Sequence, residues 1–337
     1  MTYALRRIAV TVPLLLAVSF VVYGLVDLLP GDPAAARFDV HTNPEVVARW
    51  RAERGLDDPF LVRWGRYVRG AVTSFDLGAS YRSDLPVAPR LSEKLQATVE
   101  LTLFALTIAI VVGGTVGILS AVFPRSPIDY LGNVIALAGI SVPVFWLGMM
   151  LIWFAVNQLG YPFSSNRYAA HLDADEYLTH LYLLESLVRM RGDMLASCAR
   201  NLLLPALALS TIPMAVITRM TRSAMLEELG RDYARTARAK GLTRRAVVLR
   251  HVLRNALIPI TTITGLQFGH LLGGAVLTET VFSWPGLGTY IVRQGVEARD
   301  TPIIVGGILL VATMFVLVNL AVDLLYAVID PRVREAS

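Results

Sequence analysis

Six long apolar stretches alternate with polar segments along this chain of 337 residues. A bilayer core is about 30 Å thick and takes roughly 20 apolar residues per helix, because every backbone polar group inside it must be satisfied within its own segment. The pattern therefore predicts an all-α integral membrane protein with six transmembrane helices. The six predicted spans run approximately from Ile8 to Leu29, Leu101 to Phe123, Leu131 to Leu159, Leu202 to Ile217, Ala256 to Phe282 and Ile303 to Ile329.

Two of these stretches need comment. The fourth is the shortest and carries Pro205 and Pro213, which a membrane helix tolerates where its neighbours satisfy the freed carbonyl. The first is about 22 residues long and has no small-residue cleavage pattern after it. We interpret it as a retained anchor rather than a signal peptide.

Composition supports the same class of protein. The chain is 55% hydrophobic and only 17% charged, with a mean hydropathy of +0.55, which is too apolar for a water-soluble globule. Its formal charge of +5 is better explained by anionic lipid and orientation in the bilayer than by nucleic acid. Cys198 is the only cysteine, which excludes an internal disulfide, and its expected role is a small buried side chain. No cofactor or metal site is predicted.

The distribution of Lys and Arg predicts the orientation. With the amino terminus inside, the cytoplasmic segments carry 15 basic residues against six acidic ones, ten of the basic ones between Arg219 and Arg254. The opposite side carries 16 basic against 17 acidic residues, mostly in a connection too long for the rule to count. We expect both termini to be cytoplasmic.

The long connection from Pro30 to Gln96 predicts two short amphipathic helices. They cover Pro44 to Arg54 and Pro59 to Val72, and Gly55 separates them as a stop signal. We expect them on the outer surface. They are either a docking platform or lid over the outer mouth, or an interfacial pair that shields the bundle with Trp and Arg at the lipid boundary.

A basic, small-residue segment lies between the fourth and fifth spans. A two-turn helix is predicted from Tyr233 to Lys240, with Asp232 as its N-cap and Gly241 in the left-handed position where helices end. Thr243 can cap a second helix. The segment has no spacing of catalytic groups or metal ligands, so its predicted chemistry is recognition.

Small residues form one face of this predicted helix. Tyr233, Ala234 and Ala237 gather on one side, which we expect to allow close approach of a partner, while Arg235 and Arg238 point elsewhere. On spacing alone, a solvated basic helix lying against anionic lipid is an equally good interpretation.

The segment resembles the coupling loop of permease subunits of bacterial-type ABC importers, whose pattern is Glu-Ala-Ala, three residues and Gly. Thr236, Ala237 and Gly241 match in place, whereas Arg235 stands where the broad family has Glu. Arg-Thr-Ala-Arg-Ala-Lys-Gly-Leu and Arg-Asn-Ala-Leu-Ile-Pro instead resemble the dipeptide and oligopeptide permease branch, in particular the first of its two permeases. Further matches to this branch are Leu29-Pro30-Gly31-Asp32-Pro33, Gly55-Leu56-Asp57-Asp58-Pro59-Phe60, Phe75-Asp76-Leu77-Gly78-Ala79-Ser80, Ser141-Val142-Pro143-Val144-Phe145-Trp146, Glu279-Thr280-Val281-Phe282-Ser283-Trp284-Pro285-Gly286-Leu287-Gly288, Arg299-Asp300-Thr301-Pro302 and Asp330-Pro331-Arg332.

The resemblance implies a type I ABC importer permease fold with an N-terminal extracytoplasmic helical insertion, in the cytoplasmic (inner) membrane. It implies residues 1–94 as first helix plus insertion, 95–330 as importer core with the coupling loop at about 223–256, and 331–337 as a cytoplasmic tail. The implied partners are a second, non-identical permease, two ATPases and an extracytoplasmic solute-binding protein. The implied ATPase-coupling residues are Asp232, Tyr233, Arg235, Thr236, Ala237, Arg238, Lys240 and Gly241.

The chain itself carries no sign of catalysis. Its only lysines, Lys94 and Lys240, do not stand in a Gly-Lys-Ser/Thr phosphate loop, so ATP hydrolysis is expected of partner subunits. Candidates for the translocation path are Gln267 and His270, since polar groups at membrane depth usually face a bundle or cavity, although they also often only bond a neighbouring helix.

Two other classes of protein fit the sequence less well. An ion-gradient-driven secondary transporter is the main alternative, but it favours intramembrane carboxylates and internal repeats, and only Asp27, Glu100 and Asp323 lie near span ends. An intramembrane hydrolase ranks last, because neither Gly-x-Ser-x-Gly nor His-Glu-x-x-His occurs. The sequence does not choose the solute among dipeptides, oligopeptides, nickel complexes and glycosides.

Overall fold

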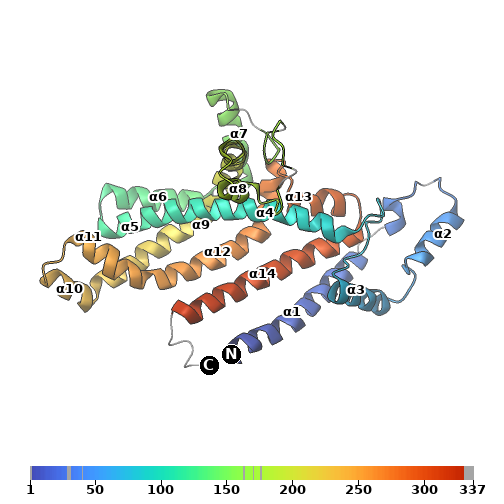
Figure 1. The fold of residues 1–337 in the computed structure, drawn as a ribbon, viewed down its shortest axis with the longest axis horizontal. Helices are drawn as coiled ribbons and strands as arrows, with labels where there is room; N and C mark the ends of the chain where they lie inside the picture. Colours follow the sequence, from blue (N-terminus) through green and yellow to red (C-terminus); the bar gives the residue numbers. More distant parts are fainter. Residues whose placement is uncertain are drawn as a thin grey trace. The chain divides into compact units, whose positions relative to one another are not determined.

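The computed structural model is built from helices (Figure 1). It describes residues 2–28, 32–39, 41–161, 164–169, 171–174 and 177–329. The helices in chain order are α1 (Thr2–Asp27), η1 (Pro33–Ala36), α2 (Pro44–Glu53), α3 (Phe60–Ser74), α4 (Val87–Ile108), η2 (Ala109–Gly113), α5 (Gly114–Val122), α6 (Pro127–Ser141), α7 (Val144–Leu159), α8 (Tyr182–Val188), α9 (Gly192–Gly230), α10 (Asp232–Ala239), α11 (Arg244–Ala246), η3 (Val247–Val252), α12 (Leu253–Val281), α13 (Leu287–Tyr290), η4 (Ile291–Val296) and α14 (Thr301–Ile329).

Four helical segments are long and apolar enough to cross a membrane, namely Val87–Val122, Gly192–Gly230, Arg244–Val281 and Thr301–Ala321. They confirm the second, fourth, fifth and sixth predicted spans. The first predicted span is helical as well, and its described apolar part, Thr11–Asp27, is shorter.

The third predicted span is wrong as one continuous helix. Pro127–Ser141 and Val144–Leu159 meet at a bend of 106° and form a fifth span only if the pair is counted as one. Pro143 explains the break, since a proline disfavours helical geometry at the residue before it, and Val142 is extended with a ψ of 125°. A long apolar run alone did not reveal this corner.

Some predictions fall outside the described residues. These are Leu29, Pro30 and Gly31 after the first span, and the carboxyl-terminal stretch from Asp330 onward, with Arg332 and the predicted tail 331–337. The side chain of Asp323 is likewise outside the described part of the chain.

The chain divides into two compact units, which we describe separately. One comprises residues 1–98 and 285–316, and the other comprises residues 99–284 and 317–337. The predicted boundary between residues 94 and 95 falls inside α4.

The first unit contains the predicted insertion. The amphipathic helices are confirmed as α2 and α3, and Gly55 between them has a φ of +58°. Trp50 is buried with Ala34 and Tyr81, with Phe38 packed edge-on against the indole. A second core joins α3, α4, α13 and α14, and its buried residues are Leu77, Val87, Leu91, Leu287 and Ile303.

The second unit is organised around α9, which packs against α5, α6, α7, α8, α10 and α12. The approach of α9 to η2 and α5 depends on glycine. A Cβ on Gly113 would lie 2.6 Å from the carbonyl oxygen of Met214, and one on Gly117 would lie 2.7 Å from that of Thr218. Small residues at such a seam let membrane helices pack closely.

Candidate functional site

The basic segment of residues 223–256 forms the end of α9, then α10, α11 and η3, and enters α12. Figure 1 shows α10 and α11 beside the ends of α9 and α12. The predicted helix is confirmed within a residue at each end. The predicted N-cap is wrong, because Arg231 takes the extended cap position and Asp232 is the first helical residue. An acidic side chain there still suits the positive end of the helix dipole.

The turn after α10 follows the sequence prediction. Gly241 has a φ of +80°, in the left-handed region that favours glycine, and a Cβ at this position would meet open space. Its constraint is therefore the backbone angle alone. The Oγ1 of Thr243 accepts a hydrogen bond from the backbone N–H of Ala246 at 3.3 Å, which confirms the predicted cap of α11.

The small face of α10 packs on the chain itself. Ala234 and Ala237 are buried in a core with residues of α5, α9, η3 and α12. The expectation that this face approaches a partner is wrong, because Met225, Val247 and Val252 already occupy the space that the small side chains leave.

Tyr233 fastens the start of α10 to the end of α9. Its hydroxyl donates to Oε2 of Glu228 at 2.5 Å. Partial burial and this carboxylate raise the pKa of the Tyr233 hydroxyl, so it stays a neutral donor at physiological pH.

The opposite face of α10 is open. The exposed residues of the predicted site are Asp232, Arg235, Thr236, Arg238, Lys240 and Gly241. The Arg235 side chain is 70% exposed, and among the described residues it reaches only the exposed carboxylate of Asp232, at 3.6 Å. Exposed pairs of this kind contribute little, so the guanidinium is available to another group.

Two other arginines of the segment turn back onto the chain. Nη2 of Arg238 donates to the carbonyl oxygen of Leu229 at 2.7 Å, although the sequence suggested that this arginine would meet groups on an ATPase. Arg244, which sequence reasoning did not single out, donates to the carbonyl oxygen of Val122 and stacks 4.8 Å from the centre of the Phe123 ring. No local signal predicts a contact across 122 residues of sequence.

The candidate path residues lie on α12. Gln267 is half-buried and His270 is exposed. Three residues apart, they share one face of the helix. A Cβ on Gly273 or Gly274, one turn further along, would meet open space.

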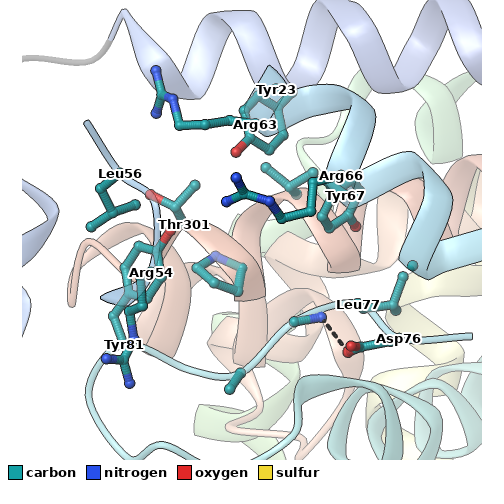
Figure 2. Close-up of a pocket in the computed structure, with 15 residues that line it drawn as sticks. Tyr23, Arg54, Leu56, Arg63, Arg66, Tyr67, Asp76, Leu77, Tyr81 and Thr301 are labelled. Carbon is teal, nitrogen blue, oxygen red and sulfur yellow. Dashed lines mark hydrogen bonds between the residues drawn. The ribbon is translucent and has the colours of Figure 1, made fainter. Parts of the chain in front are cut away.

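A separate pocket of about 250 Å³ lies in the first unit, lined by α1, α3, the residues 76–81 and the start of α14 (Figure 2). Arg63 pairs with Asp27 at 2.7 Å, and Arg66 pairs with Asp58. Burial raises the pKa of the Tyr67 hydroxyl, which therefore remains protonated. The pocket thus offers hydrogen-bond donors with most of its positive charge already paired.

No group of three or more His, Cys, Asp or Glu side chains that could hold a metal ion occurs within the described residues.

Solved structures share this fold. A structure titled as an inward-facing conformation of the MetNI methionine ABC transporter aligns with a TM-score of 0.53 at 19% identity, over 71% of this chain and 96% of that one. At this identity the likeness shows the fold alone. The fold class predicted from the sequence, an all-α membrane permease of the type I importer kind, is confirmed. The molecule is thus a multi-pass membrane protein with the fold of an importer permease.

Family comparisons are more specific. The family model described as "Binding-protein-dependent transport system inner membrane component" matches residues 113–335, and a model for the N-terminal part of such components matches residues 1–102. The chain belongs to this family.

Curated relatives match the chain almost from end to end. The dipeptide transport system permease protein DppB of Alkalihalophilus pseudofirmus is 44% identical and covers 99% of both chains. The protein of the same name from Escherichia coli K12 is 43% identical, over 99% of this chain and 98% of its own. The glutathione transport system permease protein GsiC of Escherichia coli O6:H1 is 38% identical over 99% of both chains. The resemblance to the first-permease branch is confirmed.

Proposed function

We propose that this chain is the first permease subunit of an ATP-driven importer of dipeptides or oligopeptides, and that it forms half of the translocation path. The observation that carries the proposal is the end-to-end identity of 40–44% with several dipeptide permeases. The remaining subunits are a second permease, two ATPases and an extracytoplasmic solute-binding protein.

The energy enters through α10. Its exposed face carries Arg235, Thr236 and Lys240, which are accessible to acidic or polar groups on an ATPase. Gly241 turns the chain at the end of this contact. ATP-driven closure of the ATPases displaces α10, and the spanning helices rock between inward and outward openings. Gln267 and His270 are candidate lining residues.

Both termini and α10 are cytoplasmic in this proposal, and the insertion of α2 and α3 faces the binding protein. The hollow next to α3 supports a docking role, since it admits a side chain of a partner (Figure 2). Arg66→Gln is expected to raise the binding-protein concentration needed for half-maximal uptake. Arg69→Gln, on the same helix but outside the pocket, is the control.

The whole assembly tests the proposal. The four-subunit complex in proteoliposomes, supplied with its binding protein and radiolabelled Ala-Ala, is expected to accumulate the dipeptide only when ATP is present. Accumulation driven by a proton or sodium gradient without ATP would instead establish the secondary transporter. Uptake of a nickel complex but not of Ala-Ala or a tetrapeptide would overturn the peptide assignment alone.

A further inference from the structure

Two arginines of the basic segment bond to the ends of neighbouring helices, Arg244 across 122 residues of sequence and Arg238 across nine. Val122 is the last residue of α5, and Leu229 lies in the last turn of α9. Carbonyl groups in the last turn of a helix lack an intrahelical partner, and a cation beside them also suits the negative end of the helix dipole. Arg244 and Arg238 therefore cap the carboxyl ends of two different helices.

The space between these attachments is not filled. A cavity of about 550 Å³ lies between α5, α9 and η3, and both arginines line it. Its other lining residues are predominantly apolar: Ala121, Val122, Pro124, Leu226, Leu229, Gly230, Val247 and Val248. Side-chain packing thus leaves a gap at this side of α10, and Arg238 and Arg244 are the two charged residues that line it.

We propose that Arg238 and Arg244 are positioning residues that lock α10 and α11 to the carboxyl ends of α9 and α5, so that a displacement of α10 moves both helices together. The proposal rests on the proposed function for the origin of that displacement. The locking itself depends only on the geometry of this chain. It assigns Arg238 a role inside the permease, whereas Arg235 remains the residue that meets the ATPase.

Transport measurements test the consequence. In the complete complex in proteoliposomes, Arg238→Gln and Arg244→Gln are each expected to lower the Ala-Ala imported per ATP several-fold, with ATP hydrolysis largely retained, and the double variant is expected to lower it further. Arg238→Lys keeps a donor and should recover most of the ratio. Arg245→Gln is the control, because it removes the same charge next to Arg244. Arg245 is exposed and makes no hydrogen bond or ion pair with any described residue, so the ratio should stay unchanged.

A distance measurement tests the locking without reference to cargo. Spin labels are attached at exposed Arg125 and Ala239, with Cys198 replaced by Ala, in the same complex. The distance distribution should be narrow with and without ATP in the parent, and should broaden in the double Gln variant. A narrow distribution in a double variant that imports normally would overturn the proposal. A separate variant, Arg235→Glu, distinguishes the two proposals. If the arginines lock the helices but α10 does not contact the ATPase, the distance distribution still broadens in the double Gln variant, whereas Arg235→Glu leaves uptake normal.

Discussion

A single backbone angle controls the end of α10. Gly241 has a φ of +80° and free space around its missing Cβ, so a larger side chain meets no clash but strains the backbone by about 1–2 kcal/mol. Gly241→Val is expected to lower the solute imported per ATP several-fold while the chain still inserts normally. Gly192→Val, also without a nearby atom but at ordinary φ and at the far end of α9, is the control. Equal coupling ratios in the two variants would contradict a role for the turn.

Glu185, a carboxylate outside the spans, makes the stability of its loop depend on pH. Glu185 accepts hydrogen bonds from Oγ1 of Thr179 at 2.7 Å, from two backbone N–H groups, and pairs with Arg189. The Thr179 hydroxyl and these further bonds lower the pKa of Glu185 from 4.5 to about 2. The folded pKa is depressed, so the stabilisation is complete above about pH 4.5 and is lost as the pH falls toward 2.

Hydrogen exchange follows this loss directly. The amides of Leu178 and Thr179 bond the carboxylate, and their protection should decline only well below pH 4.5 in the parent. In Glu185→Ala, which removes both acceptor oxygens, their protection should already be low at pH 7. Unchanged protection in that variant would show that the loop is held by other contacts.

At the scale of elements, two neighbouring glycines offer a matched comparison. A Cβ on Gly113 meets the Met214 carbonyl at 2.6 Å, whereas one on Gly114 meets nothing within 4 Å. Overpacking costs about 1–3 kcal/mol, so Gly113→Ala should lower the thermal unfolding midpoint of the purified chain in detergent. Gly114→Ala brings the same gain in helix propensity as Gly113→Ala but no clash, so it should not lower the unfolding midpoint. A lower midpoint for Gly114→Ala alone would contradict the seam between η2 and α9.

Elements were predictable where their signals are local. Helical spacing with Gly55 and Pro59 placed α2 and α3, and the same logic placed α10 and its turn. The fourth span was underestimated, because α9 runs for 39 residues and continues as a helix through polar residues on both sides of its apolar part. Pro143 is a local signal for the corner between α6 and α7 that hydrophobicity concealed.

The site was predictable only in part, for a related reason. The position of Gly241 follows from helix-end chemistry, but the burial of Ala234 and the bonds of Arg238 and Arg244 depend on which helices lie next to α10. The sequence spacing shows that one face of α10 carries small side chains. It does not show whether the chain itself or a partner covers that face.

At the scale of the whole molecule, the excess of Lys and Arg over acidic residues on one side of the spans predicts how the chain is oriented in the membrane. Replacing the only cysteine, the buried Cys198, with Ala leaves a chain without reactive thiols, into which single cysteines can be introduced. Arg245→Cys, in the basic segment, is expected to react with a membrane-impermeant maleimide only in inverted vesicles. Val72→Cys, 78% exposed on α3, should react only in right-side-out preparations. Labelling of both positions from the same side would contradict the proposed topology.

The corner between α6 and α7 has one further consequence. Its Val144, Phe145 and Trp146 amides begin a helix and so lack intrahelical acceptors, while the carbonyls that follow Ala138 in α6 lack donors within their own helix. Hydrocarbon cannot satisfy such groups. If this corner lies within the bilayer, its backbone groups must therefore bond to water or to other protein groups, so the corner is either a point of water entry into the apolar region or a contact with another chain.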